Sequence, residues 1–155
     1  MLQHKEDMKL TMKRYRNYRP CPRIKAVFPQ MIKGLGVDIA DSNRIAGMLE
    51  KYGDHFITKA FTTEEIRYCS TRADPPLHYA GRWAAKEAFY KALPESCQKL
   101  STWKSVEIRA EDFRAPFIRI CNDKLNETMK NSEIDRVHLS ISHDRNLCIA
   151  TVILE

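Results

Sequence analysis

The chain has 155 residues, of which 43% are hydrophobic and 30% are charged, a composition typical of one folded domain. No apolar stretch approaches the roughly 20 residues that a membrane helix requires, so we expect no membrane-spanning segment. The five cysteines are scattered without a C-x-x-C pair, which argues against a disulfide framework and a zinc site and favours a reducing compartment.

The positive charge of the chain is concentrated at its N-terminus. Residues 1–30 carry eight lysines and arginines against two acidic residues, so they hold all of the formal net charge of +6. We therefore expect a basic extension over residues 1–30 and one domain over residues 31–155, in which acidic and basic residues balance. The extension is interpreted as a solvated or disordered segment, a targeting segment or a nucleic-acid contact. Glu6, Asp7 and the lack of serine argue against a typical transit peptide.

The domain is expected to open with a short buried strand over Met31–Ile39. Asp41-Ser42 supplies good helix N-caps, and apolar residues then recur at helical spacing until Gly53, which closes this helix. A capping box predicts a second, short helix over Thr62–Tyr68. The sequence Asp74–Pro76 breaks that helix.

The clearest helix covers Leu77–Leu93, and Pro94 ends it. Its apolar stripe consists mostly of small residues: Leu77, Ala80, Gly81, Ala84, Ala85, Ala88, Phe89 and Ala92. Small side chains let another element approach the helix backbone closely, so we expect this to be the central helix of the core.

The remaining chain predicts strands with one helix between them. The strands are Trp103–Arg109, Pro116–Cys121, Val137–Ser142 and a well-buried Leu147–Leu154, and the helix is Asp123–Lys130. A turn over Asp144–Asn146 makes the last two strands a hairpin. The predicted fold is α+β, with a small antiparallel sheet packed against a long central helix.

Four residues are candidates for chemistry. Asp38 follows the first strand, where a carboxylate can hold a hard cation, although aspartate there is also a common turn or capping residue. Glu87 and Lys91 are four apart on the long helix, a spacing that also suits an ordinary ion pair. His143 follows Val137, Leu139 and Ile141 at every second position, so its side chain should lie on the apolar face of this strand, at the rim of the core. A histidine there could equally have a structural role and no role in catalysis. These residue types by themselves indicate no more than a possible Mg²⁺ site that acts on a phosphate.

Three sequence blocks in a fixed order give a more specific prediction of the function. They are Gly36–Ile45 (GVDIADSNRI), Gly81–Ala92 (GRWAAKEAFYKA) and Ser140–Asp144 (SISHD), with weaker matches at Phe61–Cys69 (FTTEEIRYC) and Trp103–Ile108 (WKSVEI). Together they resemble the holo-acyl-carrier-protein synthase branch of the phosphopantetheinyl transferases. The resemblance runs from about residue 32 to the C-terminus.

The resemblance implies a reaction and a role for each candidate. Such enzymes move 4′-phosphopantetheine from coenzyme A to a serine of apo acyl carrier protein and release adenosine 3′,5′-bisphosphate. Asp38 and Glu87 match the family's Mg²⁺ ligands, and Lys91 matches the lysine beside the pyrophosphate. His143 matches the histidine at the nucleotide side, and Arg82 is a further phosphate contact. The serine proton goes to Glu87 or, as we favour, to a metal-bound water held by Asp38.

The resemblance also implies partners. Arg44 lies where family members dock an acidic helix of the carrier protein, and the small members form trimers with active sites between subunits. Two loops depart from the family pattern: Pro94–Cys97 replaces a glycine-rich turn, and Arg114 replaces a glycine, so adenosine contacts are not carried over. The expected location is the cytoplasm or an organelle with bacterial-type fatty-acid synthesis.

Two hypotheses from other functional classes remain open. The first is a Mg²⁺-dependent phosphodiesterase or nuclease that uses Asp38, Glu87 and Lys91 without any carrier protein. The second is a non-catalytic nucleic-acid-binding protein that depends on the basic residues 1–30, although the charge balance of residues 31–155 argues against it.

Overall fold

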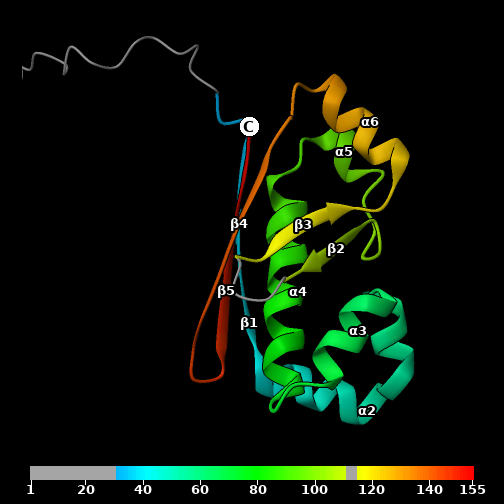
Figure 1. The fold of residues 1–155 in the computed structure, drawn as a ribbon, viewed down its shortest axis with the longest axis vertical. Coiled ribbons are helices and arrows are strands. Elements are labelled where there is room, and N and C mark those ends of the chain that lie inside the picture. Colours follow the sequence, from blue (N-terminus) through cyan, green and yellow to red (C-terminus); the bar gives the residue numbers. More distant parts are fainter. Residues whose placement is uncertain (1–30, 111–114) are drawn as a thin grey trace, which may run out of the picture. The chain divides into compact units, whose positions relative to one another are not determined.

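The computed structural model describes residues 31–110 and 115–155, which form an α+β fold (Figure 1). Three strands make one antiparallel sheet in the order β1-β5-β4. Its strands are β1 (Gly34–Asp41), β4 (Val137–Asp144) and β5 (Leu147–Leu154). Helix α4 (Pro75–Ala92) packs along one face of this sheet, against β1 and β5. The expected α+β class and small antiparallel sheet are confirmed, whereas the predicted basic extension lies outside the described residues.

The other elements lie on the side of α4 away from this sheet (Figure 1). They are α2 (Ser42–Ala60), α3 (Thr63–Ser70), α5 (Glu95–Gln98), the hairpin of β2 (Val106–Arg109) and β3 (Phe117–Ile120), and α6 (Asp123–Asn131). None of the helices in the two described ranges has the length and hydropathy that a bilayer crossing demands.

The start of α4 and the end of α2 differ from the prediction. Helix α4 begins two residues early, because Asp74 accepts a hydrogen bond from the Leu77 amide as N-cap and the two prolines occupy the first turn, where no amide donor is needed. Gly53 does not end α2. It has φ 48° and kinks the helix, which continues to Ala60 because Phe56 beyond the kink packs against Phe61 and other core aromatics.

The contact between β1 and α4 joins backbone to backbone. A Cβ atom at Gly36 would lie 1.9 Å from the carbonyl oxygen of Ala88, and one at Gly34 would lie 2.0 Å from that of Ala92. Only glycine fits at these two strand positions, and the alanines of α4 add almost no bulk. The close approach expected from the small-residue stripe is therefore present, and β1 is the element that makes it.

The sheet is covered on one face only within the chain. Alternate residues of β5 (Cys148, Ala150, Val152 and Leu154) are buried against α4, but Leu147 and Ile149 on the other face are 48% and 40% exposed. The prediction of a well-buried strand was wrong here, because the continuous apolar run does not reveal that only every second residue faces the helix. Exposed residues of β1 extend the same apolar face: Leu35, Val37 and Ile39.

A buried ion pair joins α4 to the elements on its other side. Lys86 Nζ lies 2.7 Å from Glu65 Oε2, and both side chains are shielded from solvent. Lys86 also donates to three main-chain carbonyls, those of Ala60, Trp103 and Val106. Glu65 completes the capping box of α3 with Thr62 and accepts from the amide of Ile108. Burial lowers the pKa of Lys86, and the Glu65 carboxylate opposes that shift.

We expect the substitution Gly36→Ala to destabilise the fold by about 3 kcal/mol, because the new methyl group must push β1 away from α4. Gly47→Ala is the matched control, since a Cβ there meets nothing within 4 Å and alanine favours the helix by up to about 1 kcal/mol. Urea unfolding of both variants measures the difference. Equal stability of the two variants would contradict the backbone contact.

Candidate active site

Asp38 and Lys91 meet where β1 crosses α4. Asp38 follows Gly36 on the face of β1 that contacts the helix, and its Oδ1 accepts a hydrogen bond of 2.7 Å from Lys91 Nζ. Lys91 also donates to the carbonyl of Val37 at 3.3 Å. Asp38 lies inside β1 and not at its end as predicted, because the pairing of β1 with β5 continues as far as Asp41.

Glu87 lies one helical turn before Lys91 on α4, on the same side of the helix. Burial raises the pKa of Glu87 above its ordinary value, and the negative charge of Asp38 raises it further, while Lys91 and Arg44 oppose the shift. Lys91 makes its ion pair with Asp38 and not the i,i+4 pair with Glu87 that helical spacing alone favours. The structure therefore brings Asp38, Glu87 and Lys91 together, and we call them the carboxylate cluster.

The donor set of the carboxylate cluster fits a Mg²⁺ ion. Burial and, after it, the negative charge of Asp38 raise the pKa of Glu87, and a divalent cation would relieve the repulsion between the two carboxylates. Mg²⁺ typically takes one or two protein carboxylates and completes its octahedron with water and phosphate oxygens. In the described ranges no group of three or more His, Cys, Asp or Glu residues could hold a metal ion, so an all-protein cage is not found there.

A pocket of about 390 Å³ adjoins Glu87. Its wall is mainly apolar, and the Trp103 ring is held by stacking on Trp83 at a centroid distance of 4.1 Å. We call it the Trp103 pocket, and it is lined by Lys86, Glu87, Tyr90, Ser101, Thr102, Trp103 and Val106. Sequence reasoning did not find this pocket, because Ser101 and Thr102 belong to a loop whose position depends on the bonds of Lys86.

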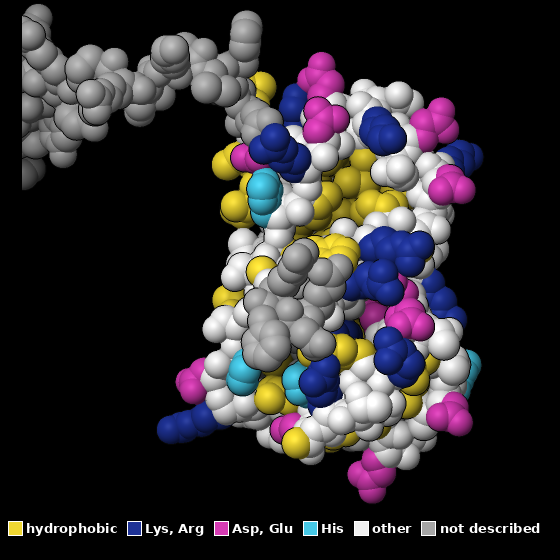
Figure 2. Space-filling view, in the orientation of Figure 1, with side chains coloured by type: hydrophobic (Ala, Val, Ile, Leu, Met, Phe, Trp, Pro, Cys, Tyr) yellow, Lys and Arg dark blue, Asp and Glu magenta, His cyan; other side chains and the backbone are white. Residues whose placement is uncertain are grey.

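Arg82 and His143 line a second pocket, of about 280 Å³. Arg82 is 6% exposed, and its Nε is buried without a hydrogen-bond partner among the described residues. His143 lies on the face of β4 that its parity predicted, but its side chain is exposed rather than at the rim of the core. Tyr68 and also His78, which lies in none of the sequence blocks, line the same pocket. Histidine and basic side chains lie close together on the lower half of the face in Figure 2. We call the pocket of about 280 Å³ that Arg82 and His143 line the Arg82 pocket.

The two groups of predicted site residues lie on different flanks of α4. Arg82 and Lys91 are nine residues apart, about two and a half helical turns, so their side chains leave the helix in opposite directions. Asp38 comes from β1 and His143 from β4, and β5 separates these two strands. Within one chain the carboxylate cluster and the Arg82 pocket therefore form separate half-sites.

Comparison with known proteins identifies the family to which the chain belongs. The sequence model of the 4′-phosphopantetheinyl transferase superfamily matches residues 34–152. The chain belongs to this superfamily. It is a phosphopantetheinyl transferase, as the three sequence blocks predicted.

Named relatives match almost over their full length. The holo-[acyl-carrier-protein] synthase of Halothermothrix orenii is 40% identical over 125 residues, which cover 81% of this chain and 98% of that protein. The crystal structure of the Neisseria meningitidis synthase is 28% identical with a TM-score of 0.70 and covers 81% of this chain and 99% of its own. The Bacillus anthracis synthase, solved in complex with CoA (3′,5′-ADP), is 32% identical with a TM-score of 0.63 and covers 80% and 96%.

The transferase departs from the family pattern just after α4. Pro94 is the N-cap of the short helix α5, at the position where the resemblance implies a glycine-rich turn in the family. The side-chain amide of Gln98 donates to the carbonyls of Tyr90 and Leu93, which closes the end of α4. The second departure, Arg114, lies outside the described residues. The segment after the carboxylate cluster is thus held by side-chain hydrogen bonds and a helix instead of a glycine turn.

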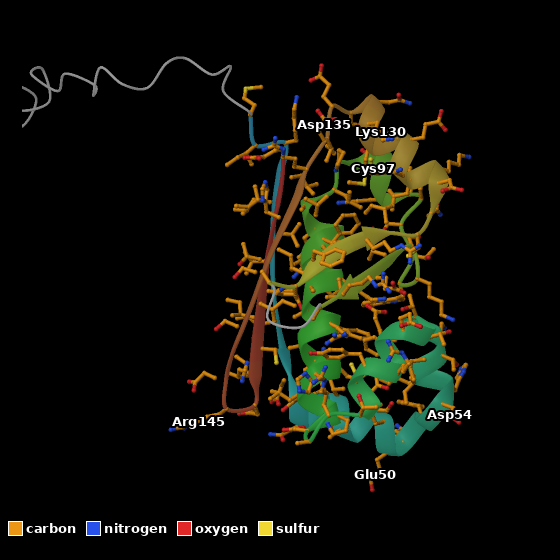
Figure 3. All side chains as sticks on the ribbon, in the orientation of Figure 1. Glu50, Asp54, Cys97, Lys130, Asp135 and Arg145 are labelled. Atoms are coloured by element: carbon orange, nitrogen blue, oxygen red, sulfur yellow. The ribbon has the colours of Figure 1, made fainter. Side chains whose placement is uncertain are left out.

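We expect Asp38→Asn to lower the pKa of Glu87, because the substitution removes a repelling negative charge and frees Lys91 to approach Glu87. A ¹³C NMR titration of the Glu87 carboxyl group measures this change. Asp54→Asn is the matched control, since Asp54 lies on the outer side of α2 (Figure 3). An unchanged Glu87 titration in Asp38→Asn would show that the two carboxylates are independent.

Proposed function

We propose that this transferase is a holo-acyl-carrier-protein synthase. It moves 4′-phosphopantetheine from coenzyme A to a serine hydroxyl of apo acyl carrier protein and releases adenosine 3′,5′-bisphosphate. The observation that carries the proposal is the convergence of Asp38, Glu87 and Lys91 at the contact of β1 with α4. The names of the relatives and the CoA complexes of two similar structures support the substrates.

Asp38 and Glu87 would hold Mg²⁺ in this proposal. The bound ion supplies positive charge to the pyrophosphate of coenzyme A as the carrier serine attacks the β-phosphorus. Lys91 stabilises the departing phosphate as a point charge, and its pKa is raised, chiefly by the hydrogen bond to Asp38, so its ammonium group stays protonated. Asp38 orients the water that accepts the serine proton.

The two pockets would receive the two ends of coenzyme A. Arg82 offers positive charge, and Arg82 and His143 both offer hydrogen-bond donors to the phosphate of the nucleotide end. The Trp103 pocket starts at Glu87 and has apolar walls, which suits the pantetheine arm that extends from the reacting phosphate.

A homotrimer with active sites between subunits is part of the same proposal. The carboxylate cluster and the Arg82 pocket face opposite flanks of α4, so one coenzyme A can touch both only if a second copy supplies one of them. The uncovered face of the sheet supplies an apolar surface for this assembly: Leu35, Val37, Ile39, Leu147 and Ile149. A contiguous apolar surface of this kind is typical of a protein–protein interface.

Arg44 would dock the carrier protein. It is an exposed residue in the first turn of α2, and its charge acts on Glu87, so it lies close to the proposed reaction centre. Acyl carrier proteins present an acidic helix in this family, and complementary charge speeds their encounter. The free thiols of Cys69, Cys97, Cys121 and Cys148 suit the cytoplasm, which we propose as the location.

The activity is tested by incubating the full chain with Mg²⁺, coenzyme A and apo acyl carrier protein and weighing the carrier by mass spectrometry. We expect a mass gain of one phosphopantetheine group. Glu87→Gln should lower the rate by at least about 100-fold, since even the loss of a residue that supports a metal ligand commonly costs 10–100-fold. Glu127→Gln, on the exposed side of α6, should leave the rate unchanged. Hydrolysis of coenzyme A or nucleic acid without a gain in carrier mass would instead favour a phosphodiesterase.

The assembly is tested with Ile149→Lys, which puts a charge at the centre of the uncovered sheet face, opposite Ile39 in the sheet register. We expect light scattering after size exclusion to give the mass of three chains for the wild type and of one chain for the variant, with loss of transfer activity. Tyr52→Lys is the control, because Tyr52 is also an exposed apolar residue but lies on α2. A monomeric wild type with full activity would overturn the trimer.

A further inference from the structure

The Arg82 pocket contains a second histidine, His78, in addition to His143. His78 lies four residues before Arg82 on α4, so both side chains leave the same side of the helix. His78 lines the pocket together with His143 from β4. The backbone carbonyl of His78 also accepts a hydrogen bond of 3.4 Å from the Arg82 guanidinium.

The aromatic ring of Tyr68 contacts two arginines and His78. The guanidinium carbons of Arg72 and Arg82 each lie 3.9 Å from the centre of the Tyr68 ring. The His78 ring meets Tyr68 edge-on, with centroids 5.8 Å apart and an interplanar angle of 74°. Cation–π contacts hold both arginines near the pocket without neutralising them. Arg82 Nε, buried and without a partner in the described part of the chain, is a donor that an incoming oxygen would satisfy.

The groups that face His78 are predominantly basic. They are Arg82 on its own helix, Arg72 before it, His143 on β4, and Asp74 at the N-cap of α4, while Tyr68 and Cys148 are the other titratable residues in the pocket lining. Burial lowers the pKa of His78, and the charges of Arg82, Arg72 and His143 lower it further, while Asp74 opposes them. The free chain therefore holds His78 neutral at physiological pH.

We propose that His78 is a further ligand-binding residue of the Arg82 pocket and takes up a proton from solvent when a phosphomonoester dianion binds there. A dianion offsets the arginine charges that disfavour the imidazolium, and the imidazolium in turn donates a charge-assisted hydrogen bond to the phosphate. The inference rests on the proposed function, in which the dianion is the 3′-phosphate of coenzyme A.

A dependence on pH follows. Because the bound state carries one more proton than the free state, affinity for the phosphomonoester rises as the pH falls from about 8 toward 6.5. A ligand that lacks this phosphate does not recruit the proton, so its affinity changes much less over the same range. The quantity that isolates the effect is the ratio of the Kd of 3′-dephospho-coenzyme A to the Kd of coenzyme A.

The test is isothermal titration of both ligands into the full chain at about pH 8 and pH 6.5, in buffers with different ionisation heats. For the wild type we expect the ratio to increase about tenfold on lowering the pH, with net proton uptake on binding coenzyme A. His78→Gln should lose most of the increase and of the uptake. His143→Gln should retain an increase because His78 is intact. Lys99→Gln, which removes one charge at the C-cap of the remote helix α5, should behave as wild type.

The outcomes separate this inference from the function itself. A wild-type increase and proton uptake that persist in His78→Gln overturn the role of His78 and leave the transferase assignment standing. Failure of the wild type to bind either ligand overturns the coenzyme A assignment, and His78 with it. Circular dichroism checks the fold of each variant, and His78→Asn replaces His78→Gln if that variant does not fold. Partial protonation of the ligand phosphate near pH 6 affects all variants equally and cancels in the comparison.

Discussion

The buried ion pair between Glu65 and Lys86 holds together most of what surrounds the active site. Each of the two residues leaves a different helix, and neither charge is exposed, so removing one partner would strand the other and typically cost 3–5 kcal/mol. Through its three carbonyl acceptors Lys86 ties the end of α2, the Trp103 loop and β2 to α4. Its neighbour in sequence, Glu87, is thereby held beside the wall of the Trp103 pocket. Stability and site geometry thus depend on adjacent residues of one helix.

Helix α4 serves two half-sites because it is covered by different elements on different sides. β1 brings Asp38 to the flank that carries Glu87 and Lys91, and β4 brings His143 to the flank that carries Arg82. In the proposed function, a single copy would bind a metal and a phosphate on one flank of α4 and the nucleotide phosphate on the other. The uncovered apolar face of the sheet is the physical reason to expect that copies combine.

Local signals in the sequence predicted the elements well. The capping box of Thr62 and Glu65, the small-residue stripe of α4 and the hairpin before β5 all depend on neighbours in the chain, and all are found. Features that depend on distant residues were missed. Asp38 was placed at a strand end because the length of β1 is decided by its pairing with β5, and the exposure of Ile149 depends on what lies beyond the sheet. His78 and Tyr68 meet only through the packing of α3 on α4, so no spacing in the sequence could reveal them.

The glycines of β1 have a consequence for how the active site can vary. At Gly34 and Gly36 the strand touches main-chain carbonyl groups of Ala92 and Ala88, so side chains cannot bring the two elements any closer. As long as these glycines and the alanines of α4 are kept, contact between the two backbones fixes the distance from the Asp38 backbone to the helix. Any tuning of the reaction centre has to come from the lengths and conformations of the side chains that cross this fixed gap, or from the loops at its rim.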